Sequence, residues 1–292
     1  MASPKVSVII PTFHDWDRLQ LCLIALTSQD FPANDFEIII ANNDPADPAP
    51  DALDLPANAR IIPASQPGSY AARNAALVEA TGDLIAFTDS DCIPEDDWLS
   101  TAVQYMTDHE DVGVIAGAIH LFAQSDRANP VEICDRIFFL RQDQYAADGY
   151  AATANVITRK SIIDAIGPFD ATLMSGGDKK WTMLAVERGY KLIYGPDIRI
   201  RHPARHRLQD MLGKARRVTG GVIAKKRATG RRFILPQFDR LIPPWRAAVR
   251  IGKTEDISTW DKIRTWLVFY RIRLTILSEQ MRLALPGQEA KR

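Results

Sequence analysis

Two carboxylates separated by one residue end a short apolar run in this sequence. The run from Leu84 to Thr88 is followed by Asp89, Ser90 and Asp91. Two hard carboxylate oxygens at this spacing suit Mg²⁺ or Mn²⁺, which normally keeps waters and takes phosphate oxygens as its remaining ligands. The same residues also fit a solvated loop, or a helix N-cap at Asp91. The spacing alone therefore leaves a metal site and a structural turn open.

Five apolar segments in the first 120 residues predict the strands that position these carboxylates. They are rich in β-branched residues and apolar on both faces, which is typical of buried parallel strands. Helical spacing lies between most of them, in residues 15–28, 70–80 and 96–107. We therefore predict an open, doubly wound α/β sheet with strands at 6–10, 36–42, 60–64, 83–89 and 112–117.

Polar residues follow the first, second and fourth of these strands. Residues 11–15 come after the first strand, residues 42–44 after the second, and residues 89–91 after the fourth. Ligands of such sheets bind beyond the carboxyl ends of the strands. We expect the three segments to meet in one polar crevice.

The familiar nucleotide motifs do not describe this crevice. No G-x-G-x-x-G follows a predicted strand, which argues against a dinucleotide site. The stretch Gly252 to Thr254 reads GKT, but it lacks the glycine five residues earlier that a P-loop requires.

Composition places the chain among ordinary globular proteins, with 46% hydrophobic and 25% charged residues. Its three cysteines, Cys22, Cys92 and Cys134, have neither the number nor the spacing of a disulfide framework or a zinc site. The first residues do not form a signal-peptide pattern. We expect a reducing, cytoplasmic compartment.

The net charge of zero conceals a division along the chain. Residues 199–292 contain 23 Lys+Arg and 7 Asp+Glu, whereas residues 1–198 contain 13 and 29. Residues 1–198 thus have a net charge of −16, and residues 199–292 have a net charge of +16. Such asymmetry favours different partners for the two parts, although two solvated faces would give the same counts.

Several stretches taken together resemble the family 2 glycosyltransferases of GT-A fold, over roughly residues 4–215. They are VSVIIPTFHDWDRLQLCLIAL, PGSYAARNAALVEATGDLIAFTDSD, ATANVITRKSIIDAIGPFDATLMSGGDKKW and ERGYKLIYGPDIRIRHPAR. The resemblance implies an open, mixed and mostly parallel sheet flanked by helices. It also implies inverting, metal-dependent transfer of a sugar from a nucleotide-sugar donor to a hydroxyl acceptor, either a glycan or a lipid-linked precursor.

The resemblance assigns most of the polar residues to the donor. Asp89 and Asp91 match the family's metal-binding pair, and His202 matches a histidine that completes the metal shell or closes over the diphosphate. Pro11, Thr12, Asp15, Asp89 and Arg73 match positions that meet the nucleotide and its diphosphate. Where the family commonly has an aspartate that reads uracil, this sequence has Asn42, which both donates and accepts, so another base becomes compatible.

The resemblance also implies the groups that face the sugars. Family members commonly carry a Gly-Gly-Glu-Asp run that supplies the catalytic base, and here Gly176 to Asp178 is followed by Lys179. Asp178 is therefore the predicted base, or alternatively a helix cap. Asn155 is predicted to hydrogen-bond a sugar. Trp181 would form an apolar floor for a sugar ring or belong to the core.

Residues 216–292 are expected to form a basic, helical C-terminal region next to a catalytic domain of residues 1–215. Its segment Trp260 to Leu285 is apolar but broken by arginines, so it does not read as a transmembrane helix. We predict that Trp260, Trp266, Phe269 and Tyr270 lie at the headgroup level of an anionic membrane, on its inner face. Packing on the catalytic domain and homodimer formation remain alternatives. No recognition motif indicates nucleic acid.

Two other functions stay open from the sequence. One is a non-catalytic, membrane-docked binding protein of the same fold, which is motivated by Asn42 and the shortened Gly-Gly-Asp run. The other is a sugar-1-phosphate nucleotidyltransferase, which should carry a glycine-rich, basic loop where this chain has PTFHDWD.

Overall fold

The protein is described by a computed structural model that covers residues 5–173, 175–228, 235–285 and 287–288. The chain divides into two compact units. The first comprises residues 1–120, 141–173 and 177–202, and the second comprises residues 121–140, 174–176 and 203–292. The boundary predicted after residue 215 falls inside helix α8 (Leu208–Ala228), and the last change from the first unit to the second comes at Pro203.

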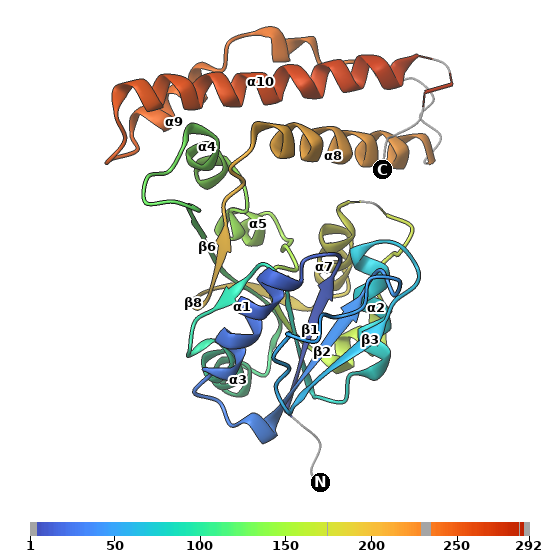
Figure 1. Ribbon diagram of the computed structural model, residues 1–292. Helices are drawn as coiled ribbons and strands as arrows, with labels where there is room; N and C mark the ends of the chain where they lie inside the picture. The colour runs from blue at the N-terminus through green and yellow to red at the C-terminus, as the bar shows by residue number, and fades with distance from the viewer. Residues whose placement is uncertain (1–4, 174, 229–234, 286, 289–292) are drawn as a thin grey trace. The chain divides into compact units, whose positions relative to one another are not determined.

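The first unit is built on a mixed sheet with the strand order β3-β2-β1-β4-β7-β6-β8-β5. Figure 1 shows β1, β2 and β3 side by side. Four strands, in the order β3, β2, β1 and β4, run parallel to one another. The strands are β1 (Val6–Thr12), β2 (Phe36–Asn42), β3 (Ala59–Pro63), β4 (Leu84–Thr88), β5 (Ile93–Pro94), β6 (Val112–Phe122), β7 (Asn155–Arg159) and β8 (Lys191–Pro203). The predicted open α/β sheet is thus confirmed.

Two of the predicted strands differ from the expectation of buried parallel strands. β6 pairs antiparallel with β7, and β7 pairs antiparallel with β4, so β6 has no parallel partner in these pairs. Its apolar sequence reflects burial and carries no information on strand direction. β3 forms the edge of the sheet and is only half-buried along most of its length.

Alternate residues of the strands pack into two separate cores, one on each face of the sheet. On β1, Val8 and Ile10 join the core that α1 (Trp16–Thr27) and α3 (Trp98–Asp108) cover. Ile9 joins the other core, which contains residues of α2 (Ser69–Glu79), α6 (Lys160–Ile166) and α7 (Gly177–Glu187). This alternation follows from the two-residue period of a strand. The shorter elements are η1 (Ala33–Asp35) and α5 (Gln142–Ala147).

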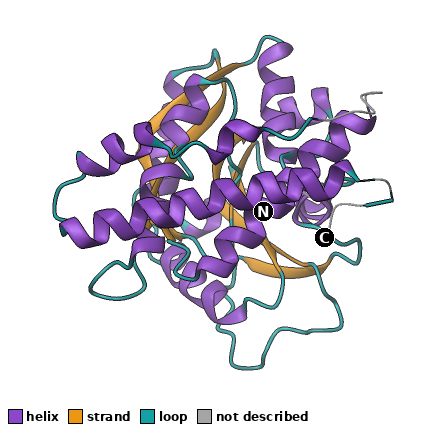
Figure 2. Ribbon diagram, turned by 90° about the horizontal axis from the view of Figure 1, so that it is seen from above, coloured by secondary structure: helices purple, strands orange, loops and turns teal. Residues whose placement is uncertain are grey.

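The second unit is helical. Its elements are α4 (Pro130–Phe138), α8, η2 (Phe238–Leu241), α9 (Trp245–Gly252) and α10 (Thr259–Ala284). The helices α4, α8 and α10 share a small core around Cys134, Met211 and Ile272. The long helix α10 is the central element of this unit in the view of Figure 2.

Side-chain hydrogen bonds cap the N-termini of α4 and α10. Asn129 and Glu132 form a capping box at the start of α4, which satisfies backbone N–H groups that a helix terminus leaves unpaired. At the start of α10, the Ser258 side chain accepts from the N–H of Asp261. Asp261 in turn pairs with Arg127 at 2.7 Å, which ties the segment before α4 to α10. The predicted helical C-terminal extension therefore folds as part of a larger helical unit.

Among the residues that the structure describes, no helix is long and apolar enough to span a membrane.

Candidate functional site

A polar cleft lies where β1 and β4 end, and we call it the strand-end cleft. Its volume is about 280 Å³. The parallel pairing of β1 with β2 and β4 brings these carboxyl ends to one edge of the sheet, as expected from the sequence. The cleft is lined by Pro11, Thr12, Phe13, Asp15, Asn43, Ser69, Arg73, Asp89, Ser90 and Asp91.

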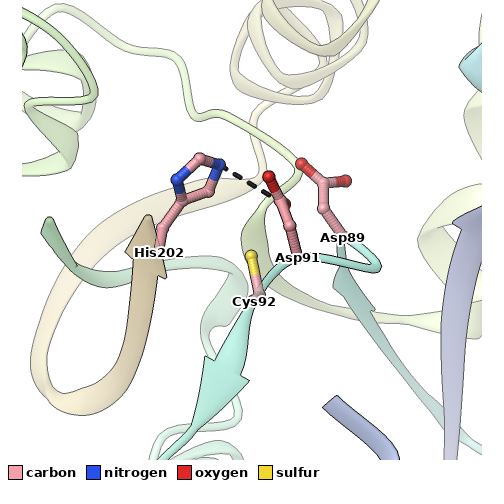
Figure 3. Close-up of side chains that lie close together, drawn as sticks. All are labelled: Asp89, Asp91, Cys92 and His202. Atoms are coloured by element: carbon pink, nitrogen blue, oxygen red, sulfur yellow. Dashed lines mark ion pairs between the residues drawn. The ribbon is translucent and has the colours of Figure 1, made fainter. Parts of the chain in front are cut away.

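Four side chains with metal-ligating atoms gather beside this cleft (Figure 3). One ligand atom from each of Asp89, Asp91, Cys92 and His202 lies within 4.8 Å of the others. Asp89 and Asp91 project from the loop after β4, and His202 reaches them from β8. The structure thus brings together the three residues predicted as metal ligands. Their oxygen and imidazole donors fit a divalent cation such as Mg²⁺ or Mn²⁺.

Negative charge is crowded at this point. Burial raises the pKa of Asp91, and the nearby carboxylates of Asp89 and Asp15 raise it further. His202 and Arg18 oppose this rise, with Nε2 of His202 3.5 Å and Nη1 of Arg18 3.7 Å from the Asp91 carboxylate. A bound cation would relieve the same repulsion, because it favours the ionised carboxylates.

Arg73 supplies a buried positive charge next to the carboxylates. The residue is 3% exposed, and its guanidinium donates to Asp89 and to the Ser69 carbonyl. Its Nε and the Oγ1 of Thr12 are buried without a hydrogen-bond partner among the described residues. Both residues line the strand-end cleft. Donors left in this state at the edge of a cleft fit a phosphate-bearing ligand.

Cys92 is a member of the cluster that the sequence did not single out. It is fully buried, and burial raises its pKa well above the usual range, with Asp89 and Asp91 adding to the shift. Its Sγ lies 3.9 Å from the Ala154 carbonyl. Because burial favours the protonated thiol, Cys92 packs behind the carboxylates as a small apolar group.

The loop after β2 uses Asn42 and Asn43 in different ways. The Asn42 side chain donates to the Asp47 carbonyl and accepts from the N–H of Asp44, so it holds its own loop together. Asn43 lines the strand-end cleft, and its Oδ1 accepts from the N–H of Gly68, directly before α2. A base contact by Asn42 remains a prediction.

The loop after β1 is held in an unusual conformation. His14 has a φ of 54°, a left-handed value that costs a side-chain-bearing residue roughly 1 kcal/mol or more. Both ring nitrogens lie 3.0 Å from carboxylates of the next loop, those of Asp44 and Asp47. Phe13 beside it is 61% exposed at the cleft. Phe13 was not predicted from the sequence, although an aromatic residue shortly after a predicted strand is visible there.

Asn155 and Trp181 are both buried in the core, which for Trp181 is one of the two places that the sequence left open. Asn155 is fully buried, and its Oδ1 accepts a hydrogen bond from the indole N–H of Trp98. Its Nδ2 donates to the backbone carbonyls of Ala118 and Ile198. Trp181 is 3% exposed, and its indole N–H donates to the Gly167 carbonyl. Neither side chain lines the strand-end cleft.

Asp178 lies at the start of α7 and is half-buried. Its Oδ1 accepts from the N–H of Lys179 at 2.8 Å and from the hydroxyl of Tyr70 at 3.1 Å. A Cβ added at Gly177 would lie 2.7 Å from the Tyr70 ring, so only glycine allows this approach. Burial, and then the charge of Asp178, raises the pKa of Tyr70 to about 12, which keeps the hydroxyl protonated as a donor. Tyr70 was not predicted from the sequence.

The sequence is similar to those of known glycosyltransferases. The sequence profile of the family described as "Glycosyl transferase family 2" matches residues 7–167. The chain is 32% identical over 231 residues to Glycosyltransferase AglE of Haloferax volcanii. The match covers 75% of this chain and 73% of that protein. It is 24% identical over 208 residues to a protein of Methanococcus voltae named dolichyl N-acetyl-alpha-D-glucosaminyl phosphate 3-beta-D-2,3-diacetamido-2,3-dideoxy-beta-D-glucuronosyltransferase. The match covers 66% of this chain and 65% of that protein.

Solved structures share the fold. The mannosyltransferase PcManGT of Pyrobaculum calidifontis, determined with GDP-Man and Mn²⁺, superposes with a TM-score of 0.62 at 15% identity. The alignment covers 99% of this chain and 89% of that one. At this identity the likeness concerns the fold, and it supports the GT-A architecture.

The crowding of carboxylates yields a stability prediction for Asp91→Asn. Because the pKa of Asp91 is raised in the folded state, its ionised form is disfavoured there, and the cost is present at pH 7 and absent well below pH 4. Without metal at pH 7, we expect Asp91→Asn to melt at or above the wild-type temperature. We also expect the rise in Tm that Mn²⁺ gives the wild type to disappear, as measured by differential scanning fluorimetry.

A matched control is Asp83→Asn, an exposed aspartate at the opposite end of β4 that should keep the full Mn²⁺ response. A metal-free Asp91→Asn protein that melts several degrees below wild type would contradict the account of charge crowding. An undiminished Mn²⁺ response in that variant would contradict the metal assignment.

Proposed function

Because the chain belongs to glycosyl transferase family 2, we propose that it transfers a sugar from a nucleotide-sugar donor to a hydroxyl acceptor, with inversion at the anomeric carbon. One observation carries the proposal: three metal-ligating side chains meet a buried arginine beside one cleft. Clustered carboxylates suit a divalent cation, and a buried guanidinium suits phosphate oxygens. The GDP-Man and Mn²⁺ of the Pyrobaculum enzyme support the same two ligand classes.

The leaving nucleoside diphosphate accumulates negative charge in this reaction. Arg73 and Thr12, with their buried donors, would hold the diphosphate oxygens. Asp89, Asp91 and His202 would hold Mg²⁺ or Mn²⁺, which supplies positive charge for the departing group when it is bound. Pro11 and Asp15 line the same cleft and would shape the nucleotide loop. The exposed ring of Phe13 is an apolar surface on which a base can rest.

Asp178 is the proposed general base. The acceptor oxygen bonds to the anomeric carbon while the bond from that carbon to the diphosphate breaks, and the hydroxyl proton must go to a nearby base. Both hydrogen bonds described for the Asp178 carboxylate go to Oδ1, so we assign Oδ2 as the proton acceptor. Tyr70 would act as a positioning residue that fixes the carboxylate plane.

We propose that the acceptor is a glycan or a lipid-linked precursor. The name of the Methanococcus relative includes a dolichyl phosphate, and this supports a lipid-linked acceptor for the present chain. Asn42 has both donor and acceptor atoms, so it is compatible with uracil or with another base in the donor.

The proposed function is tested by supplying purified protein and Mn²⁺ with a panel of UDP-, GDP- and dTDP-sugars and measuring released nucleoside diphosphate. We expect slow hydrolysis of one donor class, abolished in Asp91→Asn. Binding of a nucleotide-sugar without any turnover, even with candidate acceptors, would favour a non-catalytic binding protein. Formation of a nucleotide-sugar from sugar 1-phosphate and nucleoside triphosphate would indicate a nucleotidyltransferase.

Asp178→Asn should separate chemistry from binding. Proton removal matters in the transition state, so we expect kcat to fall by about 10²- to 10⁴-fold while the donor Kd changes less than twofold. Asp164→Asn on the exposed face of α6 serves as the control and should behave as wild type. If Asp178→Asn weakened donor binding as much as turnover, Asp178 would be a structural cap.

Tyr70→Phe removes only the hydroxyl that orients Asp178 and keeps the ring against Gly177. We expect kcat to fall about tenfold, equivalent to about 1.4 kcal/mol, with donor affinity unchanged. In the Asp178→Asn background, Tyr70→Phe should have no further effect on kcat, because the carboxylate that Tyr70 orients is already absent. Additive losses in the double variant would show that Tyr70 acts independently of Asp178.

A further inference from the structure

The second unit contains a cleft that the proposed sugar transfer does not use, and we call it the arginine cleft. It lies among η2, α9, α10 and the end of α4, and its volume is about 420 Å³. Its lining residues are Phe138, Asp239, Ile242, Pro243, Pro244, Trp245, Arg246, Ala247, Arg250, Phe269 and Arg273. Three arginines against one aspartate make this lining strongly cationic.

The apolar part of the lining is unusually exposed. Trp245 is 65% exposed and Ile242 is 62% exposed. The neighbouring Phe238 and Leu241 of η2 and Val249 of α9 are each more than half exposed as well. Large apolar side chains gathered within a dozen residues indicate a surface that meets an apolar partner.

The arginines approach aromatic rings and one another. The guanidinium carbon of Arg246 lies 5.3 Å from the Trp245 ring centroid, and that of Arg250 lies 5.3 Å from the Phe138 centroid. Arg273 donates to the Asp239 carbonyl, and its Nε is buried without a hydrogen-bond partner among the described residues. Burial, and then the charge of Arg273, lowers the pKa of nearby Arg240. Positive charge is thus concentrated beside the apolar surface.

Hydrogen bonds to α10 hold the walls of the arginine cleft in place. The indole of Trp266 donates to the Pro244 carbonyl at 3.2 Å, and the Tyr270 hydroxyl donates to the Leu241 carbonyl at 2.6 Å. Phe269 packs on Phe138 with ring centroids 4.2 Å apart. Trp266 and Tyr270 thus contact the segment from η2 to α9, and Phe269 packs on α4. The place of these residues at a membrane surface remains a prediction, as does that of Trp260, which is 60% exposed.

We propose that the arginine cleft binds an anionic membrane lipid, with the guanidinium groups on the headgroup phosphate and the acyl chain against Ile242 and Trp245. Arginine binds phosphate through paired N–H donors, and tryptophan favours the depth of the lipid headgroups. A second copy of this chain would bring two cationic surfaces together, which charge repulsion disfavours. The inference does not depend on sugar transfer, because it concerns lipid binding alone.

Vesicle co-sedimentation of the full chain tests this proposal. Neutral phosphatidylcholine vesicles are compared with vesicles that contain about one third phosphatidylglycerol, at low and high salt and without any nucleotide-sugar. We expect the full chain to prefer the anionic vesicles and to lose most of that preference in high salt. Arg246→Gln should weaken partitioning about fivefold, the effect expected for one basic residue near an anionic surface.

Two further variants separate the cleft from the general basic charge. Arg217→Gln removes another exposed arginine, on α8, that does not line the cleft, and it should reduce partitioning much less than Arg246→Gln. Trp245→Ser should reduce partitioning at low and at high salt, because it removes apolar contact. Equal losses in Arg246→Gln and Arg217→Gln would overturn the assignment of the cleft.

Two controls exclude other occupants. Inorganic phosphate at millimolar concentration should leave vesicle binding intact, since the acyl contacts are absent from free phosphate; full competition would overturn the lipid assignment. Analytical ultracentrifugation without lipid should show the same oligomeric state for wild type and Trp245→Ser. A wild-type dimer that Trp245→Ser dissociates, without vesicle binding by either protein, would identify the cleft as a subunit interface.

Discussion

Electrostatic repulsion among carboxylates at the end of β4 is the constraint on which the site depends. Asp89 and Asp91 cannot lie together beside Asp15 without nearby positive charge. The chain provides it from Arg18 on α1 and Arg73 on α2, and the imidazole of His202 on β8 lies 3.5 Å from the Asp91 carboxylate. Each of these residues is placed by packing against the sheet, so the sheet order and the charge balance are linked. A divalent cation would complete the balance.

Helix α2 connects this charge cluster with the proposed base. Tyr70 and Arg73 stand three residues apart, which places them on the same face of the helix. One reaches Asp178 and the other reaches Asp89. Asn43 fixes the start of the helix through the N–H of Gly68. The position of α2 therefore sets the distance between the leaving-group side and the base side of the proposed reaction.

The sequence predicted the strands and the residues at their ends because both follow local rules. β2 begins and ends where expected, and Asp89, Asp91 and His202 meet as the resemblance implied. Asn155 could not be placed in the same way, because its burial depends on Gly117, where a Cβ would clash with the Asn155 amide. Tyr70 gave no local signal either, since its partner is 108 residues away. Prediction from the sequence is therefore limited by packing between residues that lie far apart in the chain, because no regular spacing in the sequence connects them.

The central claim is that Asp89, Asp91 and His202 form one divalent-metal site beside a diphosphate-binding arginine. It is tested most directly by the anomalous difference map of crystals soaked with Mn²⁺ and a nucleoside diphosphate. The account predicts one strong peak about 2.1 Å from a carboxylate oxygen of Asp91, with Asp89 or His202 as a further ligand and the diphosphate next to Arg73. A nucleoside diphosphate bound in the strand-end cleft without a peak at these residues, or a peak elsewhere, would contradict it.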